Sequence, residues 1–335
     1  MKRITPLLTI LILSMITGCG PEMKSGLNKK DKVLFTVDFQ KDKALRYKFT
    51  SNRDIEVLFV NQKSKSKTDV EKTDKYNERF EMVVKYEPID VNPFGLTTIK
   101  ATCESIKATR KGGKARGSQK DAVDTLTGKS FVFTVEPTGK IKDYSQLEEL
   151  IKEAGSKAFR PRSQQGRIKE PDMVGDFIVT QWFLWDQVST IEKPYDGVSI
   201  GQSWNSKLYI PVPMVMRKAM DVAYTLKEIQ QQDENKLAVI DSTYSLSESV
   251  PKDWPIPYTG RFQMSGTFGF LRGYEILELQ GSGSDIFNIT TGQVEKYDHS
   301  YGMKMQATFP FGMGIKPEIN VKQQISMQLL TDSQP

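Results

Sequence analysis

The side chains that most often carry chemistry are scarce in this sequence of 335 residues. His299 is its single histidine, and Cys19 and Cys103 are its two cysteines. A metal site built from clustered His and Cys ligands is therefore excluded. His299 lies in a predicted strand, and no G-x-S-x-G turn supplies a serine nucleophile. We therefore interpret His299 as a surface or edge-strand histidine rather than a catalytic base.

The remaining candidate chemistry is equally sparse. Cys103 follows Ile99 and Ala101 at every second position, which predicts a buried structural thiol. The chain lacks the glycine-rich loops that bind phosphates and the D-x-D-x-D-G loop that binds calcium. We therefore predict no metal, no cofactor and no catalytic residue. A carboxylate pair for polysaccharide hydrolysis stays open, because the fold alone assembles such a pair and the sequence shows no spacing for it.

A basic run among glycines, residues 110–120, is the most polar segment of the chain. Most such runs are solvated hairpin tips. The alternative is contact with an anionic surface, such as lipid headgroups or lipopolysaccharide phosphates, where each cation contributes about 1 kcal/mol. The candidate contact residues are Arg110, Lys111, Lys114, Arg116 and Lys120.

An aromatic group provides the one functional hint inside the predicted fold. Its members come from a predicted helix and a predicted strand, and they are Phe177, Trp182, Trp185, Phe262 and Phe268. Such a cluster is most often plain core. The alternative is the wall of an apolar pocket, because a long curved sheet capped by helices encloses a lipid-sized space.

Period-two alternation of apolar and polar residues dominates the elements that would position these groups. Phe80, Met82, Val84 and Tyr86 alternate with charged residues, and the same pattern recurs in residues 99–104, 220–227, 261–270 and 319–329. Strand side chains point alternately to opposite faces, so each segment has one buried and one solvated face. The pattern is typical of antiparallel sheets.

Two helices interrupt the strands. Ser145 to Glu148 has capping-box spacing and apolar residues follow at helical intervals, which predicts a helix over about 145–159. Pro171 opens a second predicted helix over about 171–190. Residues 133–144 and 287–297 share a strand, Thr-Gly turn, strand pattern. This similarity is either chance or a sign of two similar β halves.

The N-terminus indicates where the protein resides. Lys2 and Arg3 precede an apolar run from Leu7 to Ile16, which is too short for a transmembrane helix and fits a secretory signal. Ile16-Thr17-Gly18-Cys19 resembles the lipobox of bacterial lipoproteins. The resemblance implies removal of residues 1–18 and acylation of Cys19. Gly20 in place of Asp favours the outer membrane over the inner membrane in that family.

The formal net charge of +6 falls by two when Lys2 and Arg3 are removed with the signal. This small excess, spread over a large chain, argues against nucleic acid as a partner. With Cys19 acylated, Cys103 has no partner for a disulfide, so stability comes from packing.

The predicted fold is mainly β, with long antiparallel curved sheets as a half-barrel or two similar β halves, and two helices packed on them. The predicted organisation is a lipoprotein signal at 1–18, a tether at 19–32, β halves at 33–144 and 206–335, and a helical segment with linker at 145–205. In architecture this is loosely similar to LolA-type periplasmic carriers. We expect a membrane-anchored, non-enzymatic envelope binding or scaffold protein that holds an apolar ligand such as a lipid. The alternative is the carboxylate-dependent hydrolase.

Overall fold

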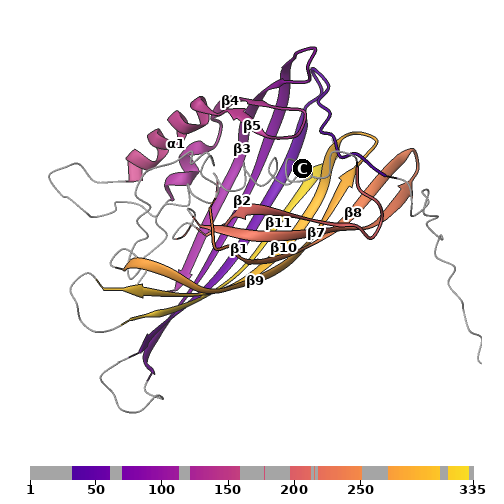
Figure 1. Cartoon of the computed structure of the whole chain (residues 1–335). Helices are drawn as coiled ribbons and strands as arrows, with labels where there is room; N and C mark the ends of the chain where they lie inside the picture. Colours follow the sequence, from indigo (N-terminus) through magenta and orange to yellow (C-terminus); the bar gives the residue numbers. More distant parts are fainter. Residues whose placement is uncertain are drawn as a thin grey trace, which may run out of the picture.

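A computed structural model describes residues 32–60, 70–112, 121–158, 177, 197–212, 215, 218–250, 271–309 and 316–331. Its strands form one curved sheet (Figure 1). The first part of the chain supplies β1 (Leu45–Val60), β2 (Val70–Val91), β3 (Thr97–Gly112), the 3-10 helix η1 (Ala122–Leu126), β4 (Ser130–Val135), β5 (Ile141–Asp143) and α1 (Ser145–Ala158). The second part supplies β6 (Ser203–Tyr209), β7 (Ala219–Gln232), β8 (Asn235–Leu246), β9 (Arg272–Asn288), β10 (Gln293–Thr308) and β11 (Glu318–Leu330).

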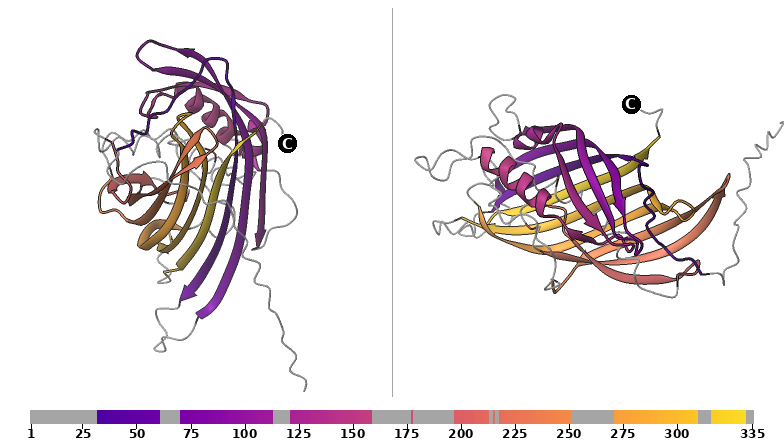
Figure 2. Two further views of the ribbon diagram at one scale, coloured as in Figure 1. Left: turned by 90° about the vertical axis from the view of Figure 1, so that its right-hand side faces the viewer. Right: turned by 90° about the horizontal axis from the view of Figure 1, so that it is seen from above.

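The sheet contains eleven strands in the order β5-β4-β3-β2-β1-β11-β10-β9-β8-β7-β6. Every neighbouring pair is antiparallel, and strands that follow one another in the chain lie side by side, except β5 and β6, which form the two edges of the sheet. The first and last strands, β1 and β11, pair at the centre from Arg46↔Leu330 to Leu58↔Glu318. The predicted mainly β, curved antiparallel fold is therefore confirmed, as one open sheet that both β-rich stretches share (Figure 2).

The alternation seen in the sequence separates the two faces of the sheet. Phe80, Met82, Val84 and Tyr86 are all buried on what we call the inner face, while their neighbours Glu81 and Lys85 are partly exposed on the outer face. Burying a side chain of this size contributes about 1.5–3 kcal/mol, which pins the strand register, since a one-residue slip would invert both faces.

The first predicted helix is present as α1. Its buried residues Leu147, Ile151 and Ala154 lie on one side, and Gln146 Oε1 accepts from the Val132 amide at 3.0 Å, which fixes α1 beside β4. The second predicted helix, 171–190, lies outside the described residues except for Phe177, which is helical and buried.

Residues 33–42 cross one end of the sheet, where the turns β2–β3, β4–β5, β7–β8 and β9–β10 lie (Figure 1). Val33 forms a β-bridge with Val198, and Asp42 donates its amide to the Pro88 carbonyl at 3.2 Å. The amides of Val37 and Asp38 donate to the carbonyls of Pro137 and Gly292. The segment thus ties hairpins from both halves of the chain together at what we call the N-terminal end of the sheet.

Candidate functional site

A row of polar residues crosses the otherwise apolar inner face. Each residue of the row pairs with the next one on the neighbouring strand, so the row runs over seven strands. Its members are Tyr244 (β8), Gly281 (β9), Tyr301 (β10), Gln323 (β11), Arg53 (β1), Glu78 (β2) and Arg110 (β3). We call this row, with the residues bonded to it, the polar belt. Arg53, Glu78 and Gln323 are at most 4% exposed. Burying such groups is costly unless each is paired, so their partners decide what the belt does.

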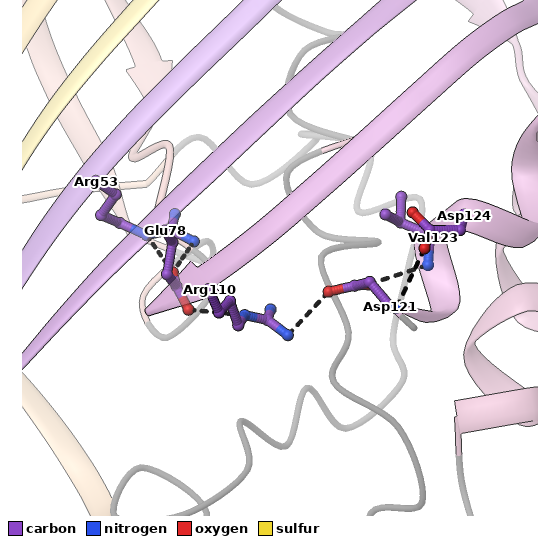
Figure 3. Close-up of polar contacts among 6 residues, drawn as sticks. All are labelled: Arg53, Glu78, Arg110, Asp121, Val123 and Asp124. Atoms are coloured by element: carbon purple, nitrogen blue, oxygen red, sulfur yellow. Dashed lines mark hydrogen bonds and ion pairs between the residues drawn. The ribbon is translucent and has the colours of Figure 1, made fainter. Parts of the chain in front are cut away.

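The half of the belt on β1–β3 is a charged chain (Figure 3). Arg53 donates from Nε and Nη2 to Glu78 Oε2 at 2.9 and 2.7 Å, and Arg110 Nε donates to Glu78 Oε1 at 2.9 Å. Arg110 Nη1 lies 2.9 Å from Asp121 Oδ2. Two cations and two carboxylates therefore alternate, and their formal charges cancel.

The charged chain ends at the cap of η1. Asp121 Oδ1 accepts from the Val123 amide at 3.0 Å, and Asp124 Oδ2 accepts from the Asp121 amide at 3.3 Å, which is a capping box (Figure 3). Burial acts to raise the pKa of Glu78, but the Arg53 and Arg110 guanidiniums and their hydrogen bonds outweigh it, so this pKa lies below its usual value. Glu78 is therefore ionised at neutral pH and links β1, β2 and β3.

The half on β8–β10 centres on His299. Its Nε2 lies 2.7 Å from Asp285 Oδ1, and Nδ1 is hydrogen-bonded to the Tyr244 hydroxyl and lies 3.2 Å from the Tyr301 hydroxyl. Tyr244 also contacts Ser242 Oγ at 2.7 Å. Burial, first of all, raises the pKa of Tyr244 and Tyr301 well above the ordinary value, so both are neutral hydrogen-bonding groups.

Two glycines on β9 make room for this cluster. A Cβ on Gly283 would lie 2.7 Å from the His299 ring, and one on Gly281 would lie 2.9 Å from Tyr301 Cδ1. Because His299 is 3% exposed and sits on β10 between β9 and β11, the prediction of a surface or edge-strand histidine is wrong. Strand alternation places His299 on the inner face, and Asp285 Oδ1 is hydrogen-bonded to its imidazole there. Its side chain is fully buried, so the cluster resembles a structural network more than an accessible base.

The outer face carries a groove of about 540 Å³ over β9, β10, β11 and β1. Paired rows of short polar residues form it, and its lining comprises Thr50, Asn52, Ser282, Gly283, Ser284, Asp298, His299, Ser300, Gln324, Ile325 and Ser326. Asp298 is the one carboxylate in this lining. The groove therefore lacks the pair of acids that the hydrolase alternative requires.

The aromatic residues proposed for an apolar pocket are described only in part. Phe177 is fully buried, and its ring meets that of Phe131 edge-on at 6.2 Å between centroids. Trp182, Trp185, Phe262 and Phe268 lie outside the described residues, as does the proposed lipid-attachment residue Cys19. Phe177 thus contributes to the core beside β4.

The basic run is likewise described at its start alone. Lys111 is exposed, whereas Arg110 is engaged by Glu78 and Asp121 of the chain itself. Lys114, Arg116 and Lys120 lie outside the described residues. The predicted buried thiol is confirmed: Cys103 is 1% exposed, and burial, followed by the charge of Glu104, raises its pKa to about 12.

Sequence reasoning missed the polar belt. The available signal was the strand alternation: Glu78 lies two residues from the buried Phe80, and His299 lies two residues from the buried Tyr297 and Tyr301. Among the residues that the structure describes, no group of three or more His, Cys, Asp or Glu side chains is placed to hold a metal ion. In the same residues no helix has the length and apolarity to cross a membrane.

Comparison with known proteins places the chain in a family. Residues 77–267, more than half of the chain, match the profile of a family of unknown function, DUF6263. The chain belongs to DUF6263. The match begins beside Glu78 in β2 and extends beyond β8, so it includes α1 and part of each β-rich stretch, and it leaves out β1, β9, β10 and β11.

No protein with a curated function matches this DUF6263 chain. Among solved structures, a lipovitellin structure described for its lipid–protein interactions aligns with a TM-score of 0.41 and 9% sequence identity. The alignment covers 89% of this chain and 26% of the lipovitellin chain, so this chain spans about a quarter of that protein.

Proposed function

We propose that this DUF6263 chain is a non-enzymatic binding protein of the bacterial cell envelope, anchored through acylated Cys19, that holds an amphipathic lipid-like ligand against the inner face of its sheet. The observation that carries the proposal is the chemical layering of that face. A polar belt lies between apolar rows on one open, curved sheet. An amphipathic molecule needs the same arrangement, apolar surface beside a few placed polar groups.

The apolar rows flank the belt in strict register. On one side Met82, Phe49, Met327 and Tyr297 pair across β2, β1, β11 and β10. On the other side Ile55, Val321, Met303 and Leu279 pair across β1, β11, β10 and β9. Methionine adapts its shape to an irregular partner, which supports binding of a flexible acyl chain.

Gln323 supplies the polar contact. Its Nε2 donates to Ser51 Oγ at 3.0 Å, while its buried Oε1 has no hydrogen-bond partner among the described residues. An unpaired buried acceptor costs about 1–3 kcal/mol, and a ligand donor such as a hydroxyl or ammonium group would remove that cost. This atom therefore favours a ligand whose polar group donates a hydrogen bond, and because Gln323 is 2% exposed, the ligand reaches it only when the inner face opens.

The test is native mass spectrometry with organic extraction on the chain purified from bacterial membranes. We expect a stoichiometric lipid adduct in the wild type. Gln323→Leu is expected to lower lipid affinity with little change in the unfolding free energy, because it removes both the unpaired Oε1 and the Nε2 hydrogen bond to Ser51, and these two effects oppose each other. A clean mass without adduct, after incubation with phosphatidylethanolamine vesicles, would contradict ligand binding.

A matched pair of bulky substitutions separates the two faces. Val321→Phe adds volume to the inner face, whereas Lys322→Phe adds it to the outer face at the next residue of β11. We expect the adduct to be lost in the first variant and retained in the second, with circular dichroism confirming that both retain strand content. Equal adduct in both folded variants would place the ligand elsewhere.

A further inference from the structure

Four of the six large, exposed apolar side chains among the described residues lie at the N-terminal end of the sheet. They are Phe94, 86% exposed, Leu34, Ile89 and Val91. Of the other two, Val250 follows β8 and Leu277 lies in β9. Single exposed apolar residues are ordinary on a protein surface, but several at one end mark an interaction surface.

The turn between β2 and β3 is built to keep Phe94 outside. Asn92 Oδ1 accepts from the amides of Phe94 and Leu96, both at 2.9 Å, and the Gly95 amide donates to the Asn92 carbonyl at 2.9 Å. Gly95 has a φ of +81°, a conformation that a side chain would strain. The turn is therefore fixed locally, and Phe94 projects from a rigid support.

The same turn is held against the neighbouring hairpin. A Cβ on Gly95 would lie 2.6 Å from Pro137 Cγ, so glycine permits close contact between the β2–β3 and β4–β5 turns. The Pro137 carbonyl in turn accepts from the Val37 amide at 3.3 Å. Phe94 is thus one turn away from the segment that leads back to Cys19.

The geometry points to a lipid surface as the partner of this end. We propose that Phe94, with Ile89 and Val91 beside it, inserts into the membrane that holds the acylated Cys19; this inference rests on the proposed anchor. Residues 20–36 join Cys19 to Val37 and span at most about 60 Å when fully extended. The anchor therefore confines the sheet near the membrane.

The charge around the tip fits a shallow interfacial position. Lys41 and Lys43 are exposed in the segment that precedes β1, where Asp42 bonds to Pro88 of β2. An aromatic and aliphatic tip with lysines beside it combines apolar burial with attraction to anionic headgroups. Asp42 and Asp90 are also exposed, so we expect apolar insertion to dominate over charge.

The test places a polarity-sensitive fluorophore on the tip. The full chain carrying Phe94→Cys is purified from bacterial membranes, labelled, and reconstituted in vesicles of phosphatidylethanolamine and phosphatidylglycerol. Cys103 stays unlabelled because it is buried and its pKa is raised. Leu277→Cys is the matched control, since residue 277 is an exposed apolar position, 43% accessible, in β9.

We expect a blue-shifted emission and quenching by lipid-borne quenchers at position 94, and neither at position 277. Modification of an unlabelled Val91→Cys thiol, which leaves Phe94 in place, by a membrane-impermeant maleimide should be about tenfold slower in vesicles than in detergent, as expected when Phe94 buries its apolar side chain. Equal emission at positions 94 and 277, with equal protection of the thiols at positions 91 and 277, would overturn the proposal.

Separate measurements test the acylation of Cys19 and the membrane insertion of Phe94. The mass of the N-terminal peptide reports whether Cys19 carries acyl chains, and native mass spectrometry reports the ligand. A signal at position 94 without acylation supports membrane insertion of the tip and contradicts the anchor. Acylated Cys19 with no signal at position 94 supports the anchor and overturns tip insertion.

Discussion

The Asp38 amide donates to the Gly292 carbonyl at 3.2 Å, and this hydrogen bond joins the N-terminal segment to the β9–β10 turn. The preceding residue, Val37, bonds to Pro137 in the β4–β5 turn. These are the two Thr-Gly turns whose sequences resemble each other, and Gly139 and Gly292 both have positive φ, +87° and +64°. Consecutive residues of one segment therefore bind equivalent turns in the two parts of the chain.

Gly292→Ala should release this segment. The added Cβ would lie 2.5 Å from the Asp38 nitrogen and 2.7 Å from the Thr36 carbonyl oxygen, in a conformation that already costs about 1–2 kcal/mol for a non-glycine residue. We expect faster amide hydrogen exchange at residues 36–38 and a lower melting temperature. Gly128→Ala is the control, because its φ is also positive and no atom lies within 4 Å of the added Cβ.

Gly283→Ala should disturb the His299 cluster. The Cβ would approach the imidazole to 2.7 Å, and overpacking of this kind costs about 1–3 kcal/mol. Gly302→Ala on β10 is the matched control, since its nearest neighbour would be 3.9 Å away. Urea unfolding measures both variants, and equal stabilities would show that the ring has room to move.

Glu78→Gln should be strongly destabilising. It removes the carboxylate shared by Arg53 and Arg110, leaving two cations without their common partner, and breaking a buried ion pair costs about 3–5 kcal/mol. Glu81→Gln, which breaks a partly exposed pair with Lys48, should cost less than about 1 kcal/mol. Chemical denaturation of the two variants at neutral pH tests the difference.

The Glu78 carboxylate also predicts an acid-dependent loss of stability. Its pKa is lower in the folded protein than the ordinary value of 4.5, so its contribution is present above that value and disappears as the pH falls through the folded pKa. The unfolding free energy of the wild type should therefore decline below about pH 4.5. The decline should be shallower in Glu78→Gln, and parallel curves would contradict the assignment.

The Cys103 thiol should be inert in the folded protein. With its pKa raised to about 12 and its side chain buried, almost no thiolate is present at neutral pH. We expect slow reaction with a chromogenic disulfide reagent in buffer and rapid reaction in denaturant. An exposed thiol introduced by Phe94→Cys should react rapidly in both conditions.

The strands could be predicted from the sequence because their information is local. Phe80, Met82, Val84 and Tyr86 alternate with charged neighbours, and this pattern alone assigned their common buried face. The helix α1 was predicted from its apolar spacing in the same way. Each prediction depended on residues fewer than about ten positions apart.

The polar belt could not be predicted because it depends on pairing between distant strands. Arg53 meets Glu78 and Gln323 meets Arg53 only once β1 has paired with both β2 and β11. Strand alternation fixes the face of a residue and leaves its register with a distant strand open. The burial of His299 could not be predicted for the same reason. Its partner Asp285 on β9, and the room that Gly283 leaves for its ring, exist only in the paired sheet.

The central pairing of β1 with β11 has a consequence for how the chain folds. Arg46 of β1 pairs with Leu330 of β11. The edge of β1 that faces β11 therefore stays unpaired until nearly the whole chain has been synthesised. Non-local pairing of this kind slows folding and leaves strand edges open to other chains in the meantime. Loss of β11 alone would split the sheet into two pieces, each with an additional bare edge. The thirteen residues of β11 therefore join β1 to β10 and cover two strand edges that would otherwise promote aggregation.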